Sequence, residues 1–227
     1  MVNLKKWKLW IYRYKIDQHK LSYKQGDKLG IIDGYLGIAD FEILMYKRTN
    51  DYQNINRAMD IFRNVKSNIV ELGKDKDLCF PTEIGGRIAS PYIKDGLAGF
   101  VYIGLELYLC GDFSKEVKED LKKNIILPAV DALRKEKWTQ YPGFLDGLSG
   151  IAYMLFKAGK VFSKKDLIDE AISILLNVET FTLDIDGCSY TPNNNFQNLT
   201  FDLESGNAGI VYVQKEVLNY INNGVLT

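Results

Sequence analysis

Histidine and cysteine are scarce in this chain of 227 residues, which contains one histidine and three cysteines. Cys79, Cys110 and Cys188 lie far apart, and none belongs to a C-x-x-C or Cys-His pair. This pattern excludes a disulfide framework and any zinc site that could be recognised from sequence. We therefore predict no metal and no other cofactor.

Long apolar runs, prolines and net charge are lacking as well. No apolar run approaches the ~20 residues that span a bilayer, and charges interrupt the N-terminal MVNLKKWKLWIYRYK, so it lacks a signal-peptide core. We expect a cytoplasmic protein without a membrane partner. Five prolines do not suggest a string of linked domains, and residues 1–227 are predicted to form one domain. The 29 basic and 29 acidic residues cancel, which argues against a nucleic-acid partner.

Positive charge is concentrated in residues 1–28, where basic residues outnumber acidic ones. In this segment Trp7, Trp10, Ile11 and Tyr14 follow helical spacing, which predicts a basic N-terminal helix with one apolar face. A basic arm that binds a membrane or nucleic acid is the alternative. The solvated helix is preferred because helical surfaces commonly carry such charges.

Residues 29–227 contain a pattern that occurs four times, and each copy includes a G-x-x-G motif. The copies are DGYLGIADFEILMY, DGLAGFVYIGLELYL, DGLSGIAYMLFKAG and SGNAGIVYVQKEVL. A single G-x-x-G is weak evidence, but four that each open a similar apolar run indicate a structural repeat. The paired glycines are Gly34 and Gly37, Gly96 and Gly99, Gly147 and Gly150, and Gly206 and Gly209.

Each apolar run is followed by a polar turn and a one-sided helical pattern, so the repeat is predicted to be an αα-hairpin. The run after Gly34 is apolar on nearly every side, which predicts an inner helix that is buried all round. The outer helices are expected over residues 55–69, 114–133 (bent or ended near Pro128) and 167–178. A turn at Gly159 and a capping box of Ser163 with Asp166 are expected before the last of these.

Hairpins of this kind pack into an open solenoid or close into an α/α toroid. Inner helices that are apolar all round favour the toroid, so the fold class predicted is all-α. The glycines are expected to let inner helices crowd together where they begin. Ahead of each glycine pair stands a residue that suits a helix N-cap, and these caps would surround one mouth of the toroid. They are Asp33, Asp95, Asp146 and Ser205.

Inner helices opening with G-x-x-G resemble those of the lanthionine cyclase (LanC-like) family. FPTEIGGRIASPYIKDGLAGF and GCSYTPNNNFQNLTFDLESGNAGIVYV resemble segments of class III and class IV lanthipeptide synthetases, which are kinase–cyclase fusions. The resemblance extends over residues 30–222. It implies an α/α toroid that adds a cysteine of a precursor peptide to dehydroalanine or dehydrobutyrine, closing a thioether ring.

The chain departs from the family pattern in two ways. Zinc-dependent members carry a Cys in one repeat and a Cys-His pair before the glycine of the next, whereas Lys94-Asp95 and Leu145-Asp146 stand there in this chain. This departure resembles the zinc-free branch. Four repeats are also only about half of a family toroid, and no kinase motif is present. We interpret the chain as the C-terminal part of a cyclase, whose partners are the missing cyclase half, the kinase and lyase parts, or a second copy in a homodimer.

The resemblance suggests candidate site residues near the mouth. Arg87 would supply positive charge for a thiolate, and Tyr92, Tyr141, Asp95 or Asp146 would exchange protons; for each, a structural role is the alternative. Asp202 and Glu204 would hold the leader region of the peptide, or simply cap and solvate. Asp184 and Asp186 fit a turn better than a calcium site.

Two other functions remain open from the sequence. The chain could be a peptide-binding scaffold without catalytic activity, or an α/α-toroid enzyme acting on carbohydrate. The carbohydrate enzyme would need two opposed carboxylates.

Overall fold

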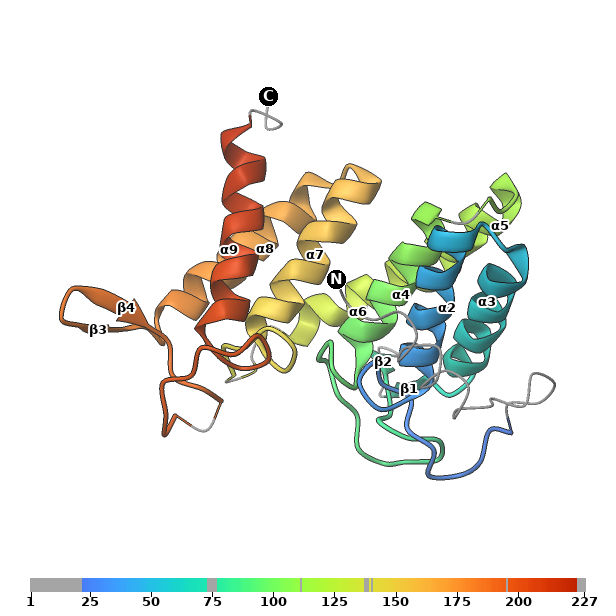
Figure 1. Ribbon diagram of the computed structural model, residues 1–227, viewed down its shortest axis with the longest axis horizontal. Helices are drawn as coiled ribbons and strands as arrows, with labels where there is room; N and C mark the ends of the chain where they lie inside the picture. Colours follow the sequence, from blue (N-terminus) through green and yellow to red (C-terminus); the bar gives the residue numbers. More distant parts are fainter. Residues whose placement is uncertain are drawn as a thin grey trace.

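The computed structural model describes residues 22–72, 77–110, 112–136, 139, 141–194 and 196–223. The predicted N-terminal helix that contains Trp7 and Trp10 lies outside these residues, and so does His19. The described residues form three αα-hairpins followed by a fourth inner helix (Figure 1). In chain order, the helices are α2 (Tyr35–Thr49), α3 (Tyr52–Lys66), α4 (Leu97–Cys110), α5 (Lys115–Asp120), a π-helical segment (Leu121–Ile126), α6 (Leu127–Leu133), a 3-10 turn (Arg134–Glu136), α7 (Leu148–Phe162), α8 (Lys165–Glu179) and α9 (Asn207–Asn222).

The inner helices are α2, α4, α7 and α9, and each packs against the next in that order. Figure 1 shows them in a row, with α2 and α9 at opposite ends. In the first hairpin the outer helix α3 packs on α2, in the second the segment from α5 to α6 packs on α4, and in the third α8 packs on α7. The predicted all-α fold of repeated hairpins, arranged as part of an α/α toroid, is thus confirmed.

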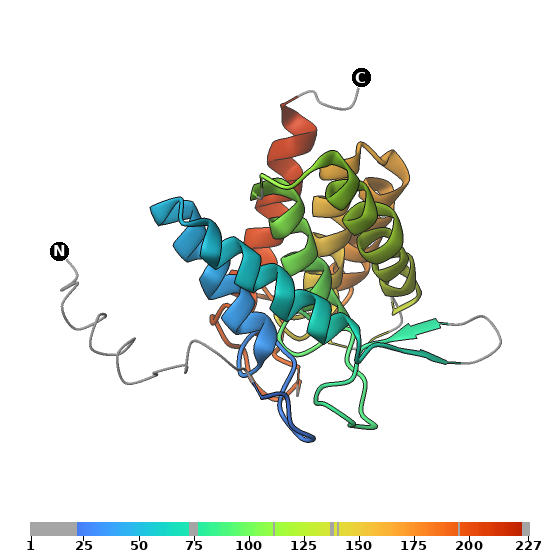
Figure 2. The same ribbon diagram turned by 90° about the vertical axis from the view of Figure 1, so that its right-hand side faces the viewer.

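Two short β-hairpins lie between the helical repeats. β1 (Val70–Leu72) pairs antiparallel with β2 (Asp77–Cys79), and β3 (Leu183–Ile185) pairs antiparallel with β4 (Cys188–Tyr190). The first projects away from the helices (Figure 2). In the second, Asp186 and Gly187 both have positive φ, as a two-residue hairpin turn requires. Asp186 therefore lies in a turn, as predicted, whereas Asp184 lies in strand β3 and not in the turn.

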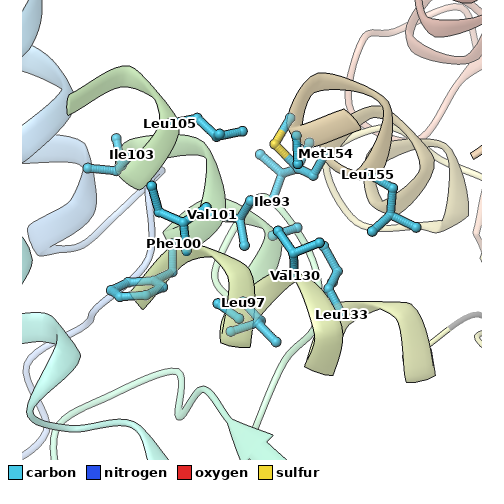
Figure 3. Close-up of a cluster of buried hydrophobic side chains, with 14 of the residues drawn as sticks. Ile93, Leu97, Phe100, Val101, Ile103, Leu105, Val130, Leu133, Met154 and Leu155 are labelled. Carbon is cyan, nitrogen blue, oxygen red and sulfur yellow. The ribbon is translucent and has the colours of Figure 1, made fainter. Parts of the chain in front are cut away.

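The core is continuous from one repeat to the next. Figure 3 shows it between α4, α6 and α7, where Val101 and Leu105 of α4 lie near Val130 and Met154. These side chains are almost completely buried. Burial of this kind contributes roughly 1.5–3 kcal/mol for each large aliphatic side chain, and it fixes the order of the repeats.

The expectation that the first inner helix is buried all round is wrong for α2. Leu36, Ala39 and Ile43 are buried, but Leu44 is 55% exposed. No inner helix precedes α2 within the described residues, and on another side of α2 Ile38, Phe41 and Met45 are only half-buried. The interior helix α4 fits the expectation much better, because helices pack against it on both sides.

The expected start of the third outer helix is also wrong. Gly159 does not form a turn, because α7 continues through it to Phe162. Ser163 is the C-cap of α7 in a left-handed conformation, and the N-cap of α8 is Lys164, whose side chain makes no capping hydrogen bond. Ser163 and Asp166 therefore form no capping box. A buried Gly159 instead makes room for Ile168 of the outer helix.

The second outer helix follows the prediction closely. Ser114 caps α5 by accepting a hydrogen bond from the Val117 N–H, 3.3 Å away. The irregularity expected near Pro128 is the π-helical segment directly before α6. Proline at the start of α6 has no N–H for the helical ladder, and this accounts for the change in hydrogen bonding there.

Candidate functional site

The loops that lead into the four inner helices share one backbone geometry. In each, the N–H after the first glycine donates to the carbonyl of the residue six positions before that glycine. A Cβ on the first glycine would lie no more than 2.6 Å from this same carbonyl oxygen, so only glycine fits. The four bonds are Tyr35 to Lys28 (3.1 Å), Leu97 to Ser90 (2.9 Å), Leu148 to Tyr141 (2.7 Å) and Asn207 to Thr200 (2.9 Å).

The second glycine of each pair also meets its own loop. A Cβ there would collide with the carbonyl oxygen of the residue three positions before the first glycine. The colliding pairs are Gly37 with Ile31, Gly99 with Ile93, Gly150 with Phe144, and Gly209 with Leu203. The predicted close approach at the helix starts is therefore real, but it joins a helix to its incoming loop and not one inner helix to another.

The prediction that Asp33, Asp95, Asp146 and Ser205 are helix N-caps is wrong. The N-caps of α2, α7 and α9 are the first glycines of the pairs, and no side chain caps these helices. Carbonyls of the incoming loops accept from the first N–H groups instead. In α4, for example, the Ala98 N–H donates to the Pro91 carbonyl, 3.1 Å away. The acidic side chains are consequently not used as caps.

Backbone hydrogen bonds join the four loops to one another. The Ile32 N–H donates to the Lys94 carbonyl (3.2 Å), the Lys94 N–H to the Leu145 carbonyl (2.8 Å), and the Leu145 N–H to the Glu204 carbonyl (2.9 Å). These four residues all stand two positions before the first glycine of their repeat. The loops therefore gather along one side of the row, where the inner helices begin, at the bottom of Figure 1, and we call this side the mouth.

Asp146 lies among charged and amide side chains at the mouth. The ammonium group of Lys94 pairs with the Glu204 carboxylate, joining the second repeat to the fourth. Asn194 Nδ2 donates to the Asp146 carbonyl, 3.3 Å away. The half-buried carboxyl of Asp146 has a buried Oδ1 with no hydrogen-bond partner among the described residues.

The surroundings of Asp146 disfavour its charged form. Burial raises the pKa of the Asp146 carboxyl above its ordinary value, and the Glu204 charge raises it further, against the opposing effects of Asn194 and Lys94. The Lys94 pKa is raised by its hydrogen bond to Glu204. A carboxyl whose pKa is raised in this way holds a proton more readily than an exposed aspartate, which suits it to accept and return one.

Three other predicted residues, Tyr92, Tyr141 and Asp95, lie in the loops that lead into α4 and α7. The Tyr92 and Tyr141 rings are 6.1 Å apart between centroids, and the Tyr92 hydroxyl is 2.5 Å from Thr139 Oγ1. Burial raises the pKa of the Tyr92 phenol. Asp95 accepts a 2.5 Å hydrogen bond from the Ser90 hydroxyl. Four of the five predicted catalytic residues thus lie in the two neighbouring loops that lead into α4 and α7.

The remaining predicted residues have other surroundings. Arg87 is exposed, and no hydrogen bond or ion pair joins it to the described residues of the mouth. Asp202 Oδ1 accepts from the N–H groups of Ser205 (2.8 Å) and Gly206 (3.3 Å), so it organises the turn before α9. These bonds hold the pKa of Asp202 below its ordinary value.

A polar belt on one face of the inner helices was not predicted from the sequence. Glu106 of α4 forms ion pairs with Lys47 of α2 (2.5 Å) and Lys157 of α7 (3.2 Å). Lys157 Nζ lies 5.0 Å from the Tyr102 ring centroid and 5.6 Å from that of Tyr153. Tyr153 and Tyr212 complete the belt, their hydroxyls 3.0 Å apart. The sequence does contain a sign of this belt: Tyr102, Tyr153 and Tyr212 each stand six positions after the first glycine of their repeat.

The model of lanthionine synthetase C-like proteins matches residues 26–223 of the chain. The chain belongs to this family. A comparison with curated proteins found no match. Among the described residues of this LanC-like chain, no helix is long and apolar enough to cross a membrane.

The residues at the motif positions do not fit a zinc ion. Lys94, Asp95, Leu145 and Asp146 precede the middle two glycine pairs, and they supply no thiolate or imidazole. Among the described residues, no group of three or more His, Cys, Asp or Glu side chains is placed to hold a metal. The three cysteines lie apart, in β2, at the end of α4 and in β4.

Proposed function

We propose that this chain is a thioether-forming cyclase of lanthipeptide biosynthesis that works without zinc. Its substrate would be a precursor peptide that carries cysteine together with dehydroalanine or dehydrobutyrine. The kinase and lyase that make the dehydrated residues would be partners, as the resemblance implies. Asp146 carries the proposal: in a LanC-like fold, its half-buried carboxyl lies at the mouth, and Oδ1 of that carboxyl has no hydrogen-bond partner among the described residues.

Asp146 is proposed to move the proton in both halves of the reaction. Its carboxylate accepts the proton of the cysteine thiol, and the thiolate attacks the β-carbon of the dehydrated residue. The C–S bond forms as the C=C electron pair moves towards the adjacent carbonyl, which gives an enolate. The protonated Asp146 then returns the proton to the α-carbon, so atoms and charge balance without another reactant.

The charges beside Asp146 support this role. Burial and the Glu204 carboxylate raise the pKa of Asp146, which makes it a better base than an exposed aspartate. Lys94, close enough to interact with the Asp146 charge, would stabilise the thiolate and the enolate. Tyr92, Tyr141 and Asp95 would line the path of the peptide. Glu204 would act indirectly, because its ion pair with Lys94 positions the Lys94 ammonium group.

The test uses a synthetic peptide with one dehydroalanine and one cysteine, and it follows the loss of alkylatable thiol by mass spectrometry. We expect the chain to accelerate ring closure and the Asp146→Asn variant to be about 100-fold slower, the usual contribution of a positioned acid–base group. The wild-type rate should fall as the pH falls through the raised pKa of Asp146. The variant should lack this dependence.

Asp33→Asn is the matched control, because Asp33 has the same place in the first repeat but is exposed. It should keep the wild-type rate. The Asp146→Asn variant should unfold at no lower temperature than wild type, since burial penalises the charged form that the substitution removes. A wild-type rate equal to the uncatalysed rate would overturn the proposal and leave a scaffold that only binds peptide.

A further inference from the structure

The inner helices present two different faces to their neighbours in the row. The face towards the preceding inner helix, the backward face, consists of the residues three, four, seven and eleven positions after the first glycine. These residues are buried in α4, α7 and α9. In α2 the same positions are only half-buried, and they are Gly37, Ile38, Phe41 and Met45.

The opposite face, the forward face, shows the reverse pattern. It consists of the residues two, five, nine and twelve positions after the first glycine. In α2 and α7 all four are buried, and in α4 three are buried and Tyr108 is half-buried. In α9 all four are exposed, Val211 and Leu218 each to 55%. The exposed forward face of α9 is Ala208, Val211, Lys215 and Leu218.

The loops show how such faces meet. A Cβ on Gly99 would lie 3.2 Å from the Ile31 side chain of the preceding loop, and one on Gly150 would lie 3.0 Å from the Ile93 side chain. The apolar residue three positions before each first glycine therefore packs over the second glycine of the next repeat. Leu203 has this position in the fourth repeat, and it is 53% exposed.

The two ends of the row are therefore complementary. One end offers Leu203 and the forward face of α9, and the other offers Gly37 and the backward face of α2. We propose that a second copy of this chain associates head to tail, so that α9 of one copy packs against α2 of the other. The contact would extend the repeat interface already present between α2, α4, α7 and α9.

A head-to-tail contact is favoured over a contact between like ends. Pairing two forward faces would bring two Lys215 side chains together, and it would leave Leu203 without a glycine to pack on. Contacts between unlike faces either close into a ring or extend the assembly. The proposal does not depend on the cyclase function, because it rests only on the repeat geometry.

Sedimentation velocity on the full chain over a range of concentrations tests the proposal. We expect the mass to rise to at least twice that of one chain as the concentration rises. A forward-face variant, Val211→Asp with Leu218→Asp, should stay at the mass of one chain. A backward-face variant, Phe41→Asp, should do the same. Leu176→Asp, on the exposed side of α8, is the control and should assemble like wild type.

Mixing the two variants gives the decisive result. Each retains one intact face, so a mixture should form dimers although neither variant does so alone. This rescue also shows that the Phe41→Asp variant is folded. Dimers of either variant alone would indicate pairing of like ends and overturn the proposal. A wild-type chain that stays monomeric at every concentration would overturn it too and assign the two faces to a different polypeptide.

Discussion

At the scale of single residues, the helix α4 contains two glycines with different surroundings, Gly99 and Gly104. A Cβ on Gly99 would collide with the Ile93 carbonyl oxygen, whereas one on Gly104 would meet only the side chains of Ile126 (3.0 Å) and Phe62 (3.1 Å). Gly99→Ala should lower the free energy of unfolding by about 3 kcal/mol, because backbone cannot move aside as side chains do. Urea denaturation measures this loss.

Gly104→Ala is the matched control for that substitution. Alanine favours the helix by about 1 kcal/mol over glycine, and this gain offsets the strain on the two neighbouring side chains. The variant should therefore stay within about 1 kcal/mol of wild type. Equal losses for the two variants would show that the loop carbonyl does not decide where glycine is needed.

Glu106 is expected to stabilise the fold, because it forms ion pairs with two lysines of the polar belt. Burial opposes its ionisation, but Lys47 and Lys157 outweigh that effect and hold its pKa below the ordinary value. Glu106→Gln should cost about 1–3 kcal/mol at pH 7, since both lysines lose a charged partner. Chemical denaturation at pH 7 and at acidic pH measures the effect.

The stabilisation that Glu106 provides depends on pH. A carboxylate with a lowered folded pKa stabilises the fold above its unfolded value of 4.5, and this contribution is lost as the pH falls through the folded value. The deficit of the variant should therefore shrink in acid. Glu216→Gln, at the same repeat position in α9 but without an ion pair to the described residues, should change stability little.

The side-chain partners of the candidate site residues could not be predicted from the sequence. Tyr92, Asp95, Tyr141 and Asp146 were proposed because they stand shortly before the glycine pairs of a repeated motif. The pairing of Lys94 with Glu204 was missed because the two residues are far apart in sequence and belong to alternate repeats. The cap roles failed for a physical reason: loop carbonyls had already satisfied the helix N–H groups that the acidic residues were expected to cap.

At the scale of helices and strands, the start of α8 lacks a side-chain cap. Lys164 is the N-cap residue, with extended backbone angles that suit aspartate. Lys164→Asp should raise the free energy of unfolding by about 1 kcal/mol, because its carboxylate can accept from free N–H groups and favours the helix N-terminus. Lys164→Ala removes the same charge without adding a cap. Thermal unfolding should show a gain for aspartate only.

Helical periodicity located the helices well, but their ends less well. The outer helix α3 was predicted because Ile55, Ala58, Met59 and Phe62 follow the spacing of one face, and all are buried. Ser163 was misread as a helix start because serine commonly caps helices. In the structure it ends α7 in a left-handed conformation. The helix α7 continues past Gly159 to Phe162, whose ring contacts Tyr108 of α4, and such a contact between repeats is not visible in a local sequence pattern.

At the scale of the whole molecule, the order of the repeats and the position of the mouth follow from the same glycines. The loops meet along one side of the row because each hydrogen-bonds to the next through the residue two positions before its glycine pair. The sequence predicted this gathering from the repeat alone. It did not predict that α2 and α9 leave complementary faces open, because exposure depends on which neighbours are present.

Amide hydrogen exchange with the dehydrated model peptide tests most directly whether substrate binds at the mouth. The account predicts slower exchange in residues 91–97, 141–148 and 200–206 when the peptide is added, and no change in the outer helices α3 and α8. The Asp146→Asn variant should show the same slowing although it closes rings poorly. Slowing confined to the outer helices, with the mouth unchanged, would contradict the account.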